Sequence, residues 1–221
     1  MENILPSENI PLKKYKHLIP ASPVIIDCGA HIGADTLKLA RLKGSTVHAF
    51  EAAPQIFSQL KEHTKNISNI ICYPLALAHK TGTASFHIST GASDGSSSLL
   101  APKQHLASHP DVYFTETVLV DVITLDDWAM QNNIPKVDVL WLDMQGAEQM
   151  MLSVSTKILP TVQLIHTEVS TIETYEGVVT YEAYKTFLAE KGFEEFIKAV
   201  PKGYDMGNVI FKRKNSVLHK V

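Results

Sequence analysis

Short apolar runs alternate along this chain with segments in which apolar residues recur every three or four positions. The runs predict β-strands and the spaced segments predict α-helices. The almost continuous apolar run 137–142 is typical of a central strand that is buried on both faces. Regular alternation of strands and helices predicts an α/β fold with a mostly parallel sheet. The predicted strands are residues 24–28, 46–50, 69–73, 83–88, 118–123, 137–142, 162–165, 193–200 and 208–212.

The chain of 221 residues is long enough for one α/β core. We predict a single domain over residues 23–214, an N-terminal arm with a short helix near residues 12–18 over 1–22, and a C-terminal tail over 215–221. Residues 89–117, which begin with a run rich in serine and glycine, are predicted to form a lid or substrate loop. A disordered insertion is the alternative for this segment.

Charge and composition narrow the class of protein. The formal net charge is −3, so nothing in the bulk composition attracts nucleic acid or acidic membranes. No apolar run reaches the ~18 residues needed to span a bilayer. Cys28 and Cys72 lie in separate predicted strands without metal-type spacing, which indicates reduced core thiols. We expect a cytoplasmic, disulfide-free protein.

The stretch 24–33 joins a buried strand to a glycine-rich turn and a helix. Open α/β sheets bind nucleotides at such a place. A dinucleotide fingerprint needs glycines at positions 27, 29 and 32, but the chain has Asp27, Gly29 and Ile32 there. An acid at position 27 suits a ligand that carries a positive charge and an amine. A nicotinamide oxidoreductase is therefore disfavoured, and an ordinary structural turn remains the alternative.

Further acids follow three other predicted strands. Glu51 ends the second strand, where a carboxylate is positioned for the two hydroxyls of a ribose. Asp143 and Glu168 end two neighbouring strands, so they should lie above the same crevice. His166 precedes Glu168 by two residues and shares its strand face if the strand continues that far. The alternatives are a helix-start carboxylate for Asp143 and an exposed strand end for Glu168.

Taken together, these pieces resemble a class I S-adenosylmethionine-dependent methyltransferase, specifically the FkbM family. The residues that carry the resemblance are Ile26–Gly33, Ala49-Phe50-Glu51, Ala76-Leu77, Ser97-Ser98-Leu99, Thr124-Leu125-Asp126-Asp127, Leu142–Glu148 and Glu168. They keep the family's order over most of residues 24–212. The resemblance implies a Rossmann-like, seven-stranded, mostly parallel sheet with a reversed strand near its C-terminal edge.

The resemblance also implies the contacts of S-adenosylmethionine. Asp27 and the turn Gly29-Ala30-His31-Ile32-Gly33 should hold the methionine part, Glu51 the ribose, and Ala76-Leu77 the surroundings of the adenine. Ser98 and Asp143 complete the expected cofactor-binding set. His31 replaces a common Asn of the family, and Trp141 and Gln145 replace a frequent Lys and Glu near the expected acceptor side.

For a hydroxyl acceptor, a methyltransferase must remove a proton or bind a metal that lowers the hydroxyl pKa. We expect Asp143 to organise the cofactor ammonium or the acceptor, and Glu168 to act as base or acceptor-binding group, with His166 as a further catalytic candidate. Magnesium held by these carboxylates is an open alternative, although no H-x-H or E-x-x-H spacing supports it.

No Asn-Pro-Pro-Tyr or Asp-Pro-Pro-Tyr motif follows the fourth strand, which argues against methylation of a base amine in nucleic acid. The family resemblance implies O-methylation of a hydroxyl on a sugar, a glycan or a small metabolite. A non-catalytic cofactor-binding or scaffolding domain is the alternative, because residues 141 and 145 depart from the family pattern.

Overall fold

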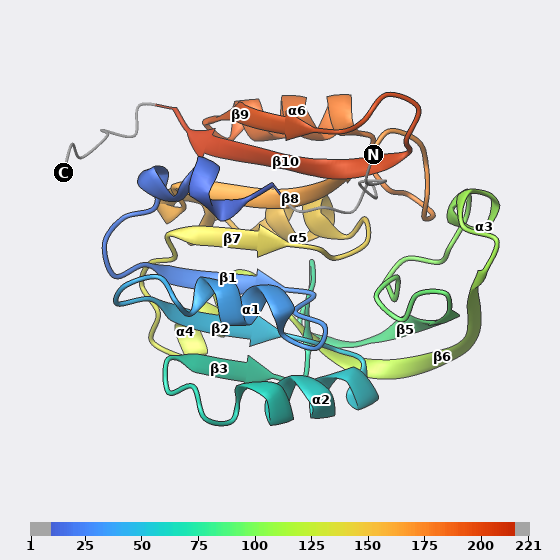
Figure 1. Cartoon of the computed structure of the whole chain (residues 1–221), viewed down its shortest axis with the longest axis horizontal. Coiled ribbons are helices and arrows are strands. Elements are labelled where there is room, and N and C mark those ends of the chain that lie inside the picture. Colours follow the sequence, from blue (N-terminus) through green and yellow to red (C-terminus); the bar gives the residue numbers. More distant parts are fainter. Residues whose placement is uncertain (1–9, 215–221) are drawn as a thin grey trace.

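The computed structural model describes residues 10–214, so residues 1–9 of the predicted arm and the predicted tail 215–221 lie outside the described residues. A seven-stranded sheet forms the centre, in the order β3-β2-β1-β7-β8-β10-β9 (Figure 1). All neighbouring strands are parallel except β10, which is antiparallel to both of its neighbours. The predicted Rossmann-like sheet with one reversed strand is confirmed. Its strands are β1 (Val24–Cys28), β2 (Thr46–Phe50), β3 (Ile70–Tyr73), β7 (Val139–Leu142), β8 (Leu164–Ser170), β9 (Phe193–Ala199) and β10 (Met206–Arg213).

Helices cover both faces of the sheet, which explains why its central strands are apolar throughout. Trp128 of α4, Met151 of α5 and Leu188 of α6 pack into the core on one face. Tyr15, between two short 3-10 turns, and Leu39 of α1 pack on the other. The helical elements are η1 (Leu12–Lys14), η2 (Lys16–Leu18), α1 (Ala34–Leu39), α2 (Pro54–Thr64), α3 (His105–Ser108), α4 (Leu125–Gln131), α5 (Glu148–Val154), η3 (Leu159–Thr161) and α6 (Tyr181–Glu190).

A second, three-stranded sheet lies beside the carboxyl ends of the main strands, in the order β4-β6-β5 (Figure 1). Its strands are β4 (Ala76–Leu77), β5 (Gly82–Gly91) and β6 (Val112–Ile123). The structure corrects the predicted loop 89–117, because both ends of that segment belong to the β5–β6 ladder and α3 lies between them. The predicted strands 83–88 and 118–123 form the middle of this ladder, and the structure extends them to Gly82–Gly91 and Val112–Ile123.

Strand β8 continues five residues beyond the predicted run 162–165, to Ser170. Its last residues pair with the reversed strand, Glu168 opposite Asn208 and Ser170 opposite Met206. This cross-strand pairing, which no local pattern reports, keeps the polar residues of β8 extended. His166 and Glu168 therefore do lie on one face of one strand, as the spacing required.

Candidate active site

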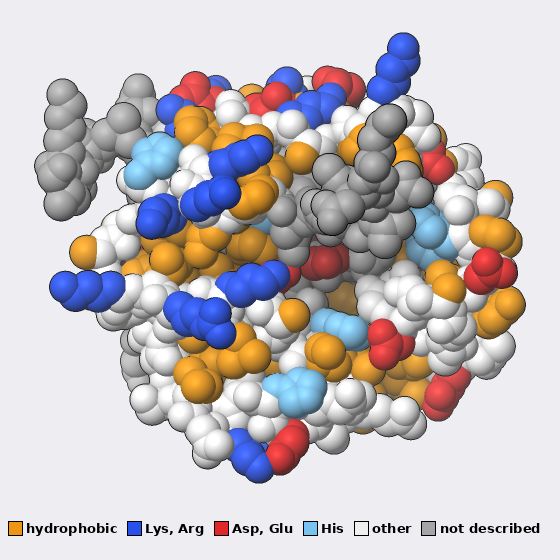
Figure 2. Space-filling view, viewed as in Figure 1, with side chains coloured by type: hydrophobic (Ala, Val, Ile, Leu, Met, Phe, Trp, Pro, Cys, Tyr) orange, Lys and Arg blue, Asp and Glu red, His pale blue; other side chains and the backbone are white. Residues whose placement is uncertain are grey.

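The strand order reverses between β1 and β7 (Figure 1). A cleft opens at the carboxyl ends of β1, β2 and β7 at this point. Its empty volume is about 560 Å³, including the part open to solvent. A second opening of about 550 Å³ lies on the other side of the turn after β1. Figure 2 shows this face hollowed near its middle, with acidic and histidine side chains around the hollow and lysine and arginine side chains gathered over η1, η2 and α1.

The turn after β1 can follow its path only with glycine at its first position. Gly29 has a φ of +79°, and a Cβ added there would lie 1.8 Å from the carbonyl oxygen of Asp143. The backbone nitrogen of Asp143 in turn donates to the carbonyl oxygen of Cys28 at 2.9 Å. The turn after β1 and the end of β7 are therefore in direct backbone contact, and each fixes the position of the other.

Asp27 lies beneath this turn and is 1% exposed. Its carboxylate accepts a hydrogen bond from the Thr36 hydroxyl of α1. Burial, reinforced by the nearby carboxylates of Asp35, Asp143 and Glu51, raises the pKa of Asp27 to about 7. A buried acid whose pKa is raised by other carboxylates favours the binding of a positively charged group at this place.

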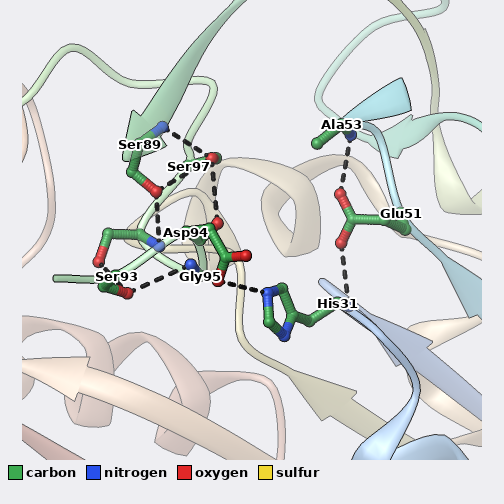
Figure 3. A network of polar contacts seen from close by, with 9 residues as sticks. His31, Glu51, Ala53, Ser89, Ser93, Asp94, Gly95 and Ser97 are labelled. Carbon is green, nitrogen blue, oxygen red and sulfur yellow. Dashed lines mark hydrogen bonds and ion pairs between the residues drawn. The ribbon is translucent and has the colours of Figure 1, made fainter. Parts of the chain in front are cut away.

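Glu51 connects the end of β2 to the same turn. One carboxylate oxygen accepts from the backbone nitrogen of His31 at 2.9 Å and the other from that of Ala53 at 2.8 Å (Figure 3). Burial raises the pKa of Glu51, although these two N–H groups oppose the shift. Each carboxylate oxygen has two lone pairs, so Glu51, which lines the cleft, can still accept ligand hydroxyls.

The serine-rich part of the predicted lid, residues 93–98, covers one side of the cleft. The His31 ring nitrogen Nε2 lies 2.9 Å from Asp94 Oδ1 (Figure 3). The hydroxyl of Ser97 accepts from the backbone nitrogen of Ser89 at 2.9 Å, which holds the segment against β5. Asp94, Gly95 and Ser97 line the cleft, so the segment is placed to contact a ligand.

The remaining predicted cofactor residues are divided between the cleft and its supports. Ala76 and Leu77 line the cleft with Phe86 and Leu99, which form an apolar wall. Ala30 lines the second opening. Gly33 is buried, with a φ of +94°, and packs against α2 at Leu60. Ser98 is buried, and its hydroxyl donates to the carbonyl oxygen of Gln145 at 2.9 Å, so it supports the cleft from behind.

Asp143 and Glu168 do lie together, as their strand ends predicted. The side-chain nitrogen of Gln145 donates to Asp143 Oδ1 at 2.8 Å and to Glu168 Oε2 at 3.0 Å. Burial raises the pKa of both carboxyls, and in Glu168 the charges of Asp143 and Glu148 add to the shift. The pair is therefore suited to hold a cation or to take up a proton.

His166 does not reach the cleft. It is 1% exposed, and its ring packs 3.7 Å from that of Trp141, centroid to centroid. Its Nδ1 lies 2.7 Å from the Tyr15 hydroxyl and its Nε2 lies 3.2 Å from Asn208 Oδ1, so both ring nitrogens are occupied. Burial lowers the pKa of His166 to about 3, which keeps the ring neutral. This geometry gives no support to a catalytic role for His166.

Three site residues were not predicted as such from the sequence: Thr36, Gln145 and Tyr175. Gln145 stood out only as a departure from a family pattern, and nothing in the local sequence marked Thr36 or Tyr175. Across residues 10–214, no group of three or more His, Cys, Asp or Glu residues could hold a metal ion. In the same part of the chain, no helix is long and apolar enough to cross a membrane.

Residues 27–195 match the family model described as the methyltransferase FkbM domain. The chain is 28% identical over 196 residues to the 2-O-methyltransferase NoeI of Sinorhizobium fredii. The aligned residues make up 86% of this chain and 79% of that protein. The fold is similar to the methyltransferase FkbM of Methylobacillus flagellatus, with a TM-score of 0.53 and 13% identity over 91% of this chain and 50% of the other. It is also similar to the fibrillarin of Methanococcus jannaschii, with a TM-score of 0.53 and 14% identity over 89% and 68% of the two chains.

Proposed function

Because this chain belongs to the FkbM methyltransferase domain family, we propose that it transfers the methyl group of S-adenosylmethionine to a hydroxyl oxygen of a sugar, a glycan or a small metabolite. One observation carries the proposal: Asp27, Glu51 and Asp143 surround a cleft at the strand-order reversal, and Glu168 is held to Asp143 through Gln145. The similarity to a 2-O-methyltransferase supports oxygen as the acceptor atom.

The residues of the cleft fit the cofactor in charge and polarity. The α-ammonium and sulfonium groups of S-adenosylmethionine are cationic, so the carboxylates of Asp27 and Asp143 favour them. Glu51 is placed for the ribose hydroxyls, and the wall that contains Leu77 and Phe86 is apolar, as an adenine ring requires. The bound cofactor supplies an electrophilic methyl carbon.

We assign proton removal to Glu168. As the new carbon–oxygen bond forms, the acceptor hydroxyl must lose its proton. A carboxylate whose pKa is raised by burial and by neighbouring carboxylates is a stronger base than an exposed glutamate. Asp143 accepts a hydrogen bond from the same Gln145 side-chain amide, and we assign it to hold the cofactor ammonium.

The charge of the site predicts the charge of the acceptor. The residues described as lining the cleft and the second opening include Asp27, Asp35, Glu51, Asp94 and Asp143, and no lysine or arginine is among them. With S-adenosylmethionine carrying radiolabel in its methyl group and a cell extract separated by anion exchange, we expect label in neutral or cationic hydroxyl compounds. Label that survives mild alkali indicates a methyl ether, and label confined to strongly retained anions such as nucleic acid contradicts this assignment.

Glu51→Gln should lower the affinity for S-adenosylhomocysteine by about 10- to 100-fold, as measured by titration calorimetry. A glutamine side chain has one acceptor oxygen, so its NH₂ group must face either the His31 or the Ala53 backbone N–H. The ribose then loses a charged acceptor as well.

Glu62→Gln on α2 is the matched control, because Glu62 is exposed and is paired with Lys65 across one helical turn. Its effect on affinity should be within about twofold. The cofactor assignment would be wrong if the wild-type protein did not bind S-adenosylhomocysteine, or if both variants bound it equally well.

A further inference from the structure

Gln145 joins two acidic side chains: Asp143, which lines the cleft, and Glu168, which lies behind it on β8. Its single side-chain NH₂ group donates to Asp143 Oδ1 at 2.8 Å and to Glu168 Oε2 at 3.0 Å. An amide nitrogen carries two hydrogens, so both are used. Gln145 itself is only 7% exposed, so the donor side of these bonds is shielded from water. The amide therefore offsets the repulsion between two carboxylates that share one donor.

The other polar atoms of Gln145 reach the opposite side of the cleft. Its side-chain oxygen accepts from the Tyr175 hydroxyl at 3.0 Å, and the same hydroxyl lies 2.7 Å from the carbonyl oxygen of Ser96. Its backbone oxygen accepts from the Ser98 hydroxyl at 2.9 Å. The covering segment 93–98 and the carboxylates beneath it are thus connected through a single residue.

The backbone at this point is held in an uncommon conformation. Gln145 has a φ of +52°, in the left-handed region that non-glycine side chains rarely adopt, and Gly146 follows with a φ of +97°. A Cβ on Gly146 would lie 2.8 Å from Val178 Cγ2, so packing against that residue fixes the turn. Strained residues of this kind cluster where a side chain must be aimed at a functional group.

We propose that Gln145 is a positioning residue for methyl transfer, whose amide holds Asp143 and Glu168 at a fixed separation and couples them to the segment 93–98. The inference rests on the proposed function, because it takes these carboxylates as the groups that serve the cofactor and the acceptor. It assigns the departure from the family pattern at position 145 to the geometry of the site and not to loss of activity.

The Gln145→Glu variant tests the donor atom alone. It keeps the side-chain length, an oxygen for Tyr175 and the backbone oxygen for Ser98, and replaces only the nitrogen by an oxygen. A third carboxylate then faces Asp143 and Glu168 and raises their pKa values. Because S-adenosylhomocysteine needs Asp143 ionised, its affinity falls as the pH drops, and this acidic limb should move upward by about one pH unit in the variant.

Calorimetric affinities between pH 5 and 9 measure this limb without any acceptor. The other titratable groups that act on the pair are unchanged in the variant, so the wild-type profile is the reference. These groups are Asp27 of β1, His31 of the first turn, Asp35 of α1, Glu148 of α5 and Tyr175 after β8. The rate of methyl transfer to the labelled acceptor fraction should show the same upward shift.

Gln145→Met removes the donor without adding charge, so it should move the limb in the same direction by a smaller amount. A purely structural role for Gln145 would lower the melting temperature of both variants and leave the limb at its wild-type pH, which would overturn the proposal. Absence of S-adenosylhomocysteine binding in the wild-type protein would overturn the proposed function and this inference with it. If the wild-type protein binds S-adenosylhomocysteine but the acidic limbs of both variants stay at the wild-type pH, this inference alone is overturned.

Discussion

Replacing Glu168 by Gln should lower the rate of methyl transfer by about 10²- to 10⁴-fold, the usual contribution of a general base. The amide cannot accept the proton of the acceptor hydroxyl. Its oxygen can still accept the hydrogen bond from Gln145, so the site should keep its shape. Affinity for S-adenosylhomocysteine, measured by calorimetry, should therefore stay within about fivefold of the wild-type value.

The pH dependence provides a second measure of the same residue. Burial and the charges of Asp143 and Glu148 raise the pKa of Glu168, and the base works only when it is ionised. The wild-type rate should thus fall as the pH drops through this raised pKa, well above the usual range of a glutamate. At saturating S-adenosylmethionine, where the affinity no longer limits the rate, this acidic limb should disappear from the residual activity of Glu168→Gln.

Glu194→Gln is the matched control for the loss of one glutamate charge. Glu194 lies on β9, far along the sheet from the cleft, and is paired with Lys212 at 3.0 Å. The Glu194→Gln variant should transfer methyl groups at the wild-type rate. Equal rates in Glu168→Gln and the wild-type protein would remove Glu168 from the mechanism, whereas methyl transfer that depends on Glu168 rejects a non-catalytic scaffolding role for the domain.

Gly29→Ala should weaken S-adenosylhomocysteine binding by at least about 100-fold and lower the free energy of unfolding by about 2–4 kcal/mol. The new methyl group would lie 1.8 Å from the carbonyl oxygen of Asp143, so the turn after β1 and the end of β7 must separate. That movement displaces the main-chain anchor of Asp143 and shifts His31, whose backbone nitrogen is bound to Glu51. Urea unfolding and calorimetry measure the two effects.

Gly177→Ala isolates the backbone strain from the steric overlap. Gly177 has a φ of +76°, close to the +79° of Gly29, but a Cβ there meets nothing within 4 Å. We expect a loss of about 1 kcal/mol in unfolding free energy and no change in binding. If the two variants were equally stable and bound the ligand equally, close approach of β1 and β7 would not be what fixes the site.

Local sequence determined most of the elements of this fold. The apolar runs of β1 and β2 match the observed strands residue for residue. Thr124 caps α4 by accepting from the Asp127 backbone nitrogen at 3.0 Å. Strand and helix alternation then sufficed for the sheet, and the acids at strand ends sufficed for the position of the cleft. These features depend on residues near one another in the chain.

Side-chain partners across the fold could not be predicted in the same way. His166 and Glu168 share one strand face, yet Tyr15 and Asn208 enclose the first, whereas Gln145 connects the second to Asp143. Residues 89–91 and 112–117, assigned to a loop from the sequence, extend the predicted strands 83–88 and 118–123 because backbone groups distant in sequence pair with each other. Such contacts have no local signature in the sequence.

The sequence by itself determined the fold class, the strand end that carries Asp27 and the kind of cofactor that an acid there would suit, because each follows from local pattern and charge. Only the tertiary structure decided that Gln145 binds Asp143 and Glu168 together, that the segment 93–98 is connected to them through Tyr175, and that His166 is enclosed. The physical reason is that hydrogen bonds and desolvation depend on distances between atoms, and folding brings together residues that are far apart along the chain.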